Sequence, residues 1–222
     1  MRAGHPIEII TISREFGSGG SQIAHLLGRR LGWRVIDHEL IEEVAHRLNA
    51  SADEVERLDE QIGGLVERVG VILARGIPDA PIMPVSPDAD YVAQIERAVI
   101  RDAASAPPFI VVGHGTQCIF HDRADALHVR VVAPLAMRAR RVAERSGRPL
   151  AEAENQTRRT DAQRRRYIRH HFGCEPADPD LYDLQINTGS IGLDEAADLI
   201  HRVVMRHGAA GAAAPPSSLP ST

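Results

Sequence analysis

Glycine and serine residues cluster in one short stretch near the start of the chain, Gly17-Ser18-Gly19-Gly20-Ser21. The β-branched run over 7–12 is typical of a buried strand, and residues 23–31 carry apolar side chains at the spacing of one helix face. The glycines therefore lie where a strand turns into a helix. In such a loop the backbone N–H groups can converge, and the helix start adds unpaired donors and a positive dipole end. This arrangement suits a phosphate group.

The stretch matches the P-loop pattern G-x-x-x-x-G-K-[ST] only in part. Arg14 stands where the pattern has its first glycine, and Gly20 stands where it has lysine. The same glycines would also serve an ordinary turn between a strand and a helix. The loop by itself leaves a phosphate site and a structural turn as alternatives.

The chain contains no lysine, since all 26 of its Lys and Arg residues are arginine. If phosphate charge is neutralised here, an arginine or a metal ion has to do it. Arg14, one step beyond the predicted strand, is the candidate for the role of the missing lysine. The alternative is that Arg14 pairs with a carboxylate such as Glu15.

Arginines are concentrated between Pro149 and Gly173, where Asp161 is the only acid from Arg158 onward. This stretch allows three interpretations: a solvated helix face, a nucleic-acid surface or a clamp that closes on phosphates. We favour the clamp because a phosphate loop precedes it, and because few aromatic residues accompany the arginines. At helical spacing Asp161 can pair with Arg158 or Arg165. That would leave three arginines for phosphate contacts: Arg159, Arg164 and Arg166.

Five short strands alternate with helices along the chain, which predicts an α/β fold with a parallel, doubly wound sheet. The predicted strands cover residues 7–12, 33–36, 109–112, 127–133 and 182–187. Ligands of such sheets bind beyond the carboxyl ends of the strands, where Asp37 and His114 also lie. Helical patterns fill 38–105 and predict a helical insertion. We expect helices at about 134–146 and 193–207, followed by a disordered tail over 208–222.

Length and composition indicate one soluble domain over 1–207. The net charge of −4 gives no general attraction to nucleic acid or to an anionic membrane. Two cysteines, Cys118 and Cys174, form no paired metal-ligand motif and are expected to be reduced or inert. With no apolar run long enough to span a bilayer, we expect a cytoplasmic protein.

Several motifs together resemble the cytidylate kinase-like family, relatives of the P-loop nucleoside monophosphate kinases. They are Ile-Ser-Arg-Glu-Phe-Gly-Ser-Gly-Gly-Ser over 12–21, Val-Ile-Asp-His-Glu-Leu-Ile over 35–41, Val-Val-Gly-His-Gly over 111–115, the arginine stretch and Tyr-Asp-Leu-Gln-Ile-Asn-Thr over 182–188. The resemblance implies a three-layer P-loop fold with a monophosphate-binding insertion at 38–105 and an arginine lid at 155–173. It also implies ATP as donor, a nucleoside monophosphate (CMP or dCMP) as acceptor, and Mg²⁺ with the nucleotide, near Ser21.

The chain departs from the cytidylate kinases where they carry Gly-Lys-Gly-Thr and, after the third strand, Asp-Gly-Arg-Asp. Two functional hypotheses therefore remain. The first is a phosphotransferase with ATP on the loop, the acceptor near Asp37 and His114, and Arg14 with the lid arginines in catalysis. The second is a nucleotide- or phosphate-binding regulatory module without turnover. Loss of the lysine favours the second, and the retained arginine stretch favours the first.

Overall fold

The computed structural model describes residues 5–37, 100 and 107–211, with side chains up to His207. The chain divides into two compact units, residues 1–35 with 108–222 and residues 36–107. The predicted helical insertion at 38–105 lies almost entirely outside the described residues and stays a prediction.

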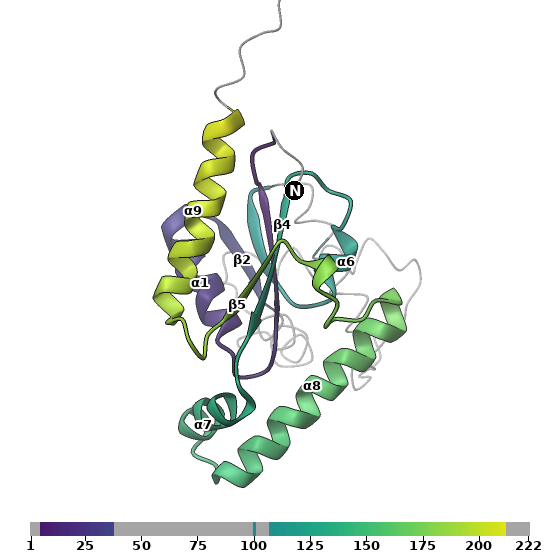
Figure 1. The fold of residues 1–222 in the computed structure, drawn as a ribbon, viewed down its shortest axis with the longest axis vertical. Helices are drawn as coiled ribbons and strands as arrows, with labels where there is room; N and C mark the ends of the chain where they lie inside the picture. The colour runs from purple at the N-terminus through teal and green to yellow at the C-terminus, as the bar shows by residue number, and fades with distance from the viewer. Residues whose placement is uncertain (1–4, 38–99, 101–106, 212–222) are drawn as a thin grey trace, which may run out of the picture. The chain divides into compact units, whose positions relative to one another are not determined.

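A five-stranded parallel sheet forms the centre of the fold (Figure 1). Its spatial order is β2-β3-β1-β4-β5, so the strand that precedes the glycine loop is central. The strands are β1 (Ile9–Arg14), β2 (Arg34–Asp37), β3 (Phe109–Val112), β4 (Ala126–Val132) and β5 (Leu184–Asn187). In register, Ile12 of β1 lies beside Val112 of β3, and Arg14 lies beside Val131 of β4. The predicted α/β fold and parallel sheet are confirmed.

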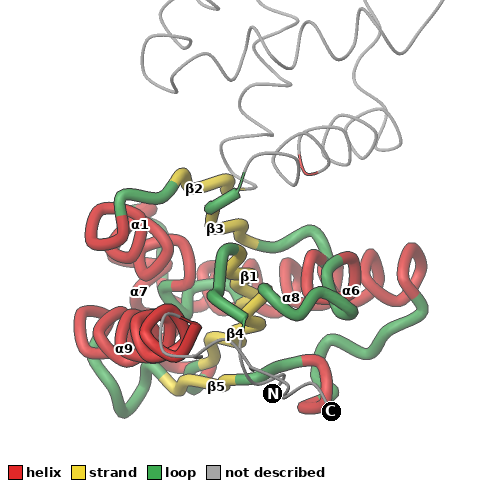
Figure 2. Tube along the Cα trace, turned by 90° about the horizontal axis from the view of Figure 1, so that it is seen from above, coloured by secondary structure: helices red, strands yellow, loops and turns green. Residues whose placement is uncertain are grey.

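Helices cover both faces of the sheet (Figure 2). α1 (Gly20–Leu31) and α9 (Leu193–Gly211) pack on the face that carries Ile10 and Ile12, and bury the main hydrophobic core there. The short α6 (Thr116–Ile119) lies on the opposite face, where the Phe109 and Phe120 rings meet edge to face at 6.0 Å. Because β1 is buried on both faces, its loop starts from a fixed point.

α7 (Leu135–Ser146) and α8 (Leu150–Phe172) form a helical hairpin that follows β4. α7 has the bounds predicted for it, between Pro134 and Gly147. α8 is a single helix of 23 residues that begins before the predicted lid boundary at 155. A 3₁₀ turn (Pro179–Leu181) then leads into β5.

Strand ends differ from the sequence prediction by one or two residues, and two helices differ by more. α6 was not predicted, because a helix of four residues is too short to show an apolar period. α9 continues to Gly211, so the tail predicted from 208 begins inside a helix. Ala209 and Ala210 explain the extension, since alanine has the highest helix propensity. Among the described residues, none of the helices combines the length and apolarity that a membrane crossing requires.

Candidate functional site

The glycine loop joins β1 to α1 at the carboxyl edge of the sheet. Gly17 and Gly19 have φ angles of +79° and +91°, which other residues rarely adopt. A Cβ at Gly17 would lie 2.8 Å from the carbonyl oxygen of Arg138, and one at Gly19 would lie 2.5 Å from Leu193 Cδ2. Backbone conformation and packing therefore already require both glycines, whether or not a ligand binds.

Ser18 is fixed inward, toward the protein. Its N–H and its hydroxyl both donate to the carbonyl oxygen of Glu15, at 3.1 and 2.7 Å, and its side chain is fully buried. Its own carbonyl accepts from the Thr188 hydroxyl at 2.6 Å and from Arg141 Nη1 at 3.3 Å. The prediction that Ser18 offers its N–H to a phosphate is therefore wrong for this conformation, because the tight turn uses that donor.

The start of α1 provides the remaining donors of the loop. The first helical hydrogen bond runs from Ile23 N to Gly19 O at 3.0 Å, so the N–H groups of Gly20, Ser21 and Gln22 precede it. Gly19, in the left-handed conformation, is the N-cap. Ser21 is half-buried in this first turn and carries the only hydroxyl among these residues. The turn keeps the N–H groups and dipole that favour an anion.

Arg14 and Gly20, the two departures from the P-loop pattern, lie against each other. A Cβ at Gly20 would be 2.7 Å from Arg14 Cβ and 3.0 Å from its Cγ, so the Arg14 side chain fills the space that a side chain at 20 would need. The guanidinium continues to Gly113 at the end of β3, where a Cβ would be 1.9 Å from Arg14 Nη1. Compared with the P-loop pattern, the basic residue stands at position 14 and the glycine at position 20, and these two residues are in contact.

The turn after β3 has an unusual backbone. Gly113, His114 and Gly115 have φ angles of +88°, +59° and +65°, and His114 is the one non-glycine residue with positive φ in the described part of the chain. Thr116 Oγ1 closes the turn by donating to Gly113 O at 2.8 Å. The His114 side chain is 8% exposed. Such conformations persist only where surrounding contacts impose them, and they often occur at functional sites.

A buried arginine on α7, Arg138, connects the glycine loop to the arginine-rich helix. Its Nη1 donates to Asp161 Oδ2 at 2.6 Å and to Phe16 O at 3.0 Å, and its Nε lies 3.3 Å from Glu15 Oε2 and donates to Ala133 O at 2.8 Å. The other oxygen of Asp161 accepts from the Phe16 N–H at 2.8 Å. Only 7% of the Arg138 side chain is exposed. α8 is thereby anchored to the loop near its middle.

Asp161 consequently does not pair within its own helix, and the prediction that it holds Arg158 or Arg165 is wrong. Arg158 pairs with Glu154 one turn earlier at 2.8 Å, and Arg165 lies 3.7 Å from Glu175. Asp161 pairs instead with the buried guanidinium of Arg138, because both partners are largely removed from water. Charge-assisted hydrogen bonds are stronger in such an environment than in water.

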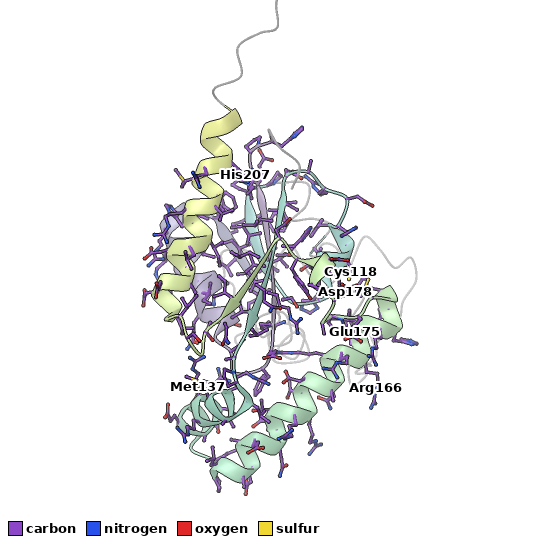
Figure 3. All side chains as sticks on the ribbon, viewed as in Figure 1. Cys118, Met137, Arg166, Glu175, Asp178 and His207 are labelled. Carbon is purple, nitrogen blue, oxygen red and sulfur yellow. The ribbon has the colours of Figure 1, made fainter. Side chains whose placement is uncertain are left out.

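The three arginines predicted to contact phosphates occupy two different environments. Arg164 lies over the Phe16 ring of the loop, with 5.4 Å between Cζ and the ring centroid, and Arg145 of α7 approaches the same ring at 5.8 Å. Arg159 and Arg166 are exposed, and Figure 3 shows Arg166 on the outer side of α8. The structure therefore brings Arg164 to the loop and leaves the other two at the surface of the helix.

Two other predicted residues, Asp37 and Ser21, are placed as follows. Asp37 is the last residue of β2 and is 4% exposed. Among the described residues, no three His, Cys, Asp or Glu side chains form a metal-binding group. A hydroxyl such as that of Ser21 suits Mg²⁺, which takes most of its ligands from phosphate oxygens and water.

Sequence reasoning missed two residues that shape the loop, Arg138 and Arg141, and it placed Thr188 at the same edge of the sheet without a role in the loop. Arg141 donates to Thr188 O at 2.8 Å and to Thr188 Oγ1 at 3.0 Å, which places both residues against Ser18. Their sequence context is an arginine-rich amphipathic helix and a strand end. Neither context distinguishes a buried arginine from an exposed one.

Tyr182 supports β1 just before Arg14. Its hydroxyl donates to Pro176 O at 2.9 Å and lies 3.1 Å from Ser13 Oγ. Burial raises the pKa of Tyr182, and the Ser13 hydrogen bond opposes that shift only in part. The phenol therefore keeps its proton at neutral pH and remains a donor.

Fold and loop together place this chain among α/β proteins that carry a glycine-rich loop between the central strand of a parallel sheet and a helix. The fold is shared with a shikimate kinase from Acinetobacter baumannii solved in complex with shikimate, at a TM-score of 0.51 and 15% identity, over 90% of this chain and 94% of that one. More specifically, the chain belongs to the cytidylate kinase-like family, whose sequence model matches residues 9–190.

Curated relatives in this family carry the name cytidylate kinase. One from Sulfolobus acidocaldarius is 27% identical over 199 residues, which are 89% of this chain and 94% of the relative. One from Desulfurococcus amylolyticus is 32% identical over 111 residues, which are 50% of this chain and 60% of the relative. The second match thus spans less than two thirds of that relative's length.

Proposed function

We propose that this protein is a nucleoside monophosphate kinase-like phosphotransferase that moves the γ-phosphoryl group of ATP to a nucleoside monophosphate. The observation that carries the proposal is the contact between Arg14 and Gly20. P-loop kinases place a positive charge on the loop lysine. In this chain Arg14, the last residue of the strand before the loop, carries a positive charge instead. Family membership supports ATP as the donor and CMP or dCMP as the acceptor.

The donor phosphates would bind at the N-terminus of α1. The N–H groups of Gly19, Gly20 and Ser21 supply neutral donors, and the guanidinium of Arg14 supplies charge at the adjacent edge of the sheet. Mg²⁺ entering with ATP would neutralise further phosphate charge beside the Ser21 hydroxyl. Because phosphoryl transfer depends mainly on positioning and charge stabilisation, a displaced cation can serve if it reaches the same phosphates.

The acceptor contacts stay a prediction from the sequence, with Asp37 and His114 as our candidates. Arg164, already over the loop, and the exposed Arg159 and Arg166 are the candidates for contacts with the transferring group. One guanidinium group can bind two oxygens of the same phosphate, which orients the phosphate as well as neutralising its charge.

A coupled assay with MgATP and a panel of CMP, dCMP, UMP, AMP and GMP tests the proposal. We expect turnover with the cytidine nucleotides and a 100- to 1,000-fold lower kcat in Arg14→Gln, the magnitude of about one lost transition-state stabiliser. Arg29→Gln, an exposed arginine of α1, is the matched control and should keep full activity.

The second candidate is a nucleotide-binding module without turnover. It is favoured by the inward hydrogen bonds of Ser18, which withdraw one N–H group from the loop. Calorimetric binding of MgATP without turnover on any acceptor of the panel would establish this alternative.

A further inference from the structure

The chain has two cysteines, 56 positions apart, and the fold brings them together. Cys118 lies on α6, and Cys174 follows Gly173, the residue that ends α8. The Cys174 thiol lies close enough to Cys118 to raise the pKa of the Cys118 thiol. Figure 3 shows Cys118 beside the region that follows α8, near Glu175.

Packing on both sides holds this pair in place. The Phe172 ring lies on the backbone of Gly115, where a Cβ would be 2.4 Å from the ring. Tyr182 accepts from Gln117 Nε2 at 3.4 Å and donates to Pro176 O at 2.9 Å, so neighbours of both cysteines meet on one phenol. Cys174 Sγ donates to Phe172 O at 3.2 Å. Each thiol thus lies between anchored residues.

Both cysteine residues are partly exposed, so neither lies in the closed core of the protein. Burial and the neighbouring Cys174 raise the pKa of Cys118 to about 12. Cys118 therefore stays protonated at neutral pH, and the thiolate is the reactive form of cysteine. The protonated Cys118 is therefore a poor first nucleophile, which leaves the first attack on an oxidant to Cys174.

We propose that Cys118 and Cys174 form a reversible intramolecular disulfide when the protein meets a peroxide, and that this bond fixes the end of α8 to α6. In the first step the Cys174 thiolate attacks hydrogen peroxide, the O–O bond breaks, hydroxide leaves and a sulfenic acid forms. In the second step the Cys118 sulfur displaces the hydroxyl group as water, with its proton, and the S–S bond forms. The two sulfurs are oxidised by two electrons in total and the peroxide is reduced.

The disulfide closes a loop that contains β4, α7 and α8. Cross-linking residues this far apart reduces the entropy of the unfolded chain, so the oxidised protein should unfold at a temperature higher by roughly 5–15 °C. Because α8 also carries Asp161 and Arg164 against the glycine loop, oxidation would couple redox state to that loop. The proposal itself does not depend on kinase activity.

Intact-mass analysis of the full chain after hydrogen peroxide treatment provides the test. We expect the mass to fall by two hydrogens, alkylation of both thiols to be blocked, and dithiothreitol to restore both. The thermal shift should appear in the wild type only.

Two variants separate the two steps. Cys118→Ser should stop at a sulfenic acid on residue 174 that a dimedone probe traps, and Cys174→Ser should resist oxidation at residue 118. Two independently oxidised thiols, a disulfide only between two chains, or no reaction in the wild type would each overturn the proposal.

Discussion

The arginines of α7 and those of α8 are the same residue type on adjacent helices, yet the structure uses them differently. Arg138 and Arg141 of α7 are directed at the glycine loop and donate to the carbonyl oxygens of Phe16 and Ser18, and Arg138 also pairs with Asp161 of α8. Arg159 and Arg166 of α8 are exposed, and no polar partner occurs for them among the described residues. Arg138 and Arg141 therefore stabilise the loop, whereas Arg159 and Arg166 remain at the surface, where a ligand could reach them. Arginine count therefore says little about phosphate binding until burial is known.

Replacing the buried Arg138 should have the largest effect on stability. Arg138→Met should reduce the free energy of unfolding by about 3–5 kcal/mol, because Asp161 and Glu15 would stay partly buried without their cation. Urea unfolding measures the loss. Arg140→Met, an exposed neighbour on the same helix, should change stability by less than about 0.5 kcal/mol. Similar losses in both variants would contradict the assignment of Arg138 as the anchor.

The contact between Arg14 and Gly20 predicts a smaller effect with a distinctive rescue. Gly20→Ala places a Cβ 2.7 Å from Arg14 Cβ, so we expect a loss of about 1–3 kcal/mol from overpacking. Adding Arg14→Gly should recover most of that loss, because the double variant removes the Cβ that the new methyl group would meet. A double-mutant cycle by urea unfolding measures the coupling, and strictly additive effects would show that the two side chains do not compete for space.

His128 extends the comparison to a buried basic side chain that the fold keeps neutral. Its Nδ1 lies 2.8 Å from Thr11 Oγ1, and burial is the main cause that lowers its pKa, opposed by Asp183 and reinforced by His121. The folded protein therefore binds this proton less readily than the unfolded chain, whose histidine pKa is about 6.5. The associated stability is complete above that pH and is lost as pH falls toward the folded pKa, by at most about 1.4 kcal/mol per pH unit.

Urea unfolding at pH 7.5 and 5.5 checks this sign. We expect the wild type to lose more stability on acidification than His128→Asn, whose side-chain oxygen can still accept from Thr11. An equal loss in both proteins would mean that His128 does not control the acid dependence.

The exposed side of the comparison predicts the smallest effect on stability. Arg159→Gln with Arg166→Gln should change the free energy of unfolding by less than about 0.5 kcal/mol, since neither side chain is buried. We propose that MgATP plus CMP protects α8 from hydrogen exchange, and the same double variant should weaken that protection. Arg29→Gln with Arg206→Gln carries the same charge change on α1 and α9 and should leave that protection intact. Full protection in the first variant would remove these arginines from the site.

The sequence was informative where local chemistry decides structure. The strand–glycine–helix pattern placed the loop, Pro134 and Gly147 bounded α7, and the apolar run at 109–112 matched β3. Long-range pairing was not predictable. Asp161 has acceptable partners one turn away, but Arg138 reaches it from another helix inside a less hydrated environment. The closeness of Arg14 to Gly113 depends in the same way on which strands are neighbours.

The structure also changes how the loop should be tested. Replacing Gly19 by valine, an obvious way to block phosphate, would place its Cβ against Leu193 and force a positive φ on a β-branched residue. Loss of binding in that variant would report a disturbed fold as readily as a lost ligand. Position 20 is the better choice, because it has no positive φ and its main obstacle is Arg14.

The exchange of Arg14 and Gly20 is tested most directly by reversing it. We would measure kcat with MgATP and CMP for Arg14→Gly, Gly20→Lys and the combined Arg14→Gly/Gly20→Lys chain, after confirming by circular dichroism that each is folded. The account predicts a 100- to 1,000-fold loss in Arg14→Gly, about what one lost charge stabiliser costs, and recovery of most of it in the combined chain. Wild-type activity in Arg14→Gly, or no recovery in a folded combined chain, would contradict it.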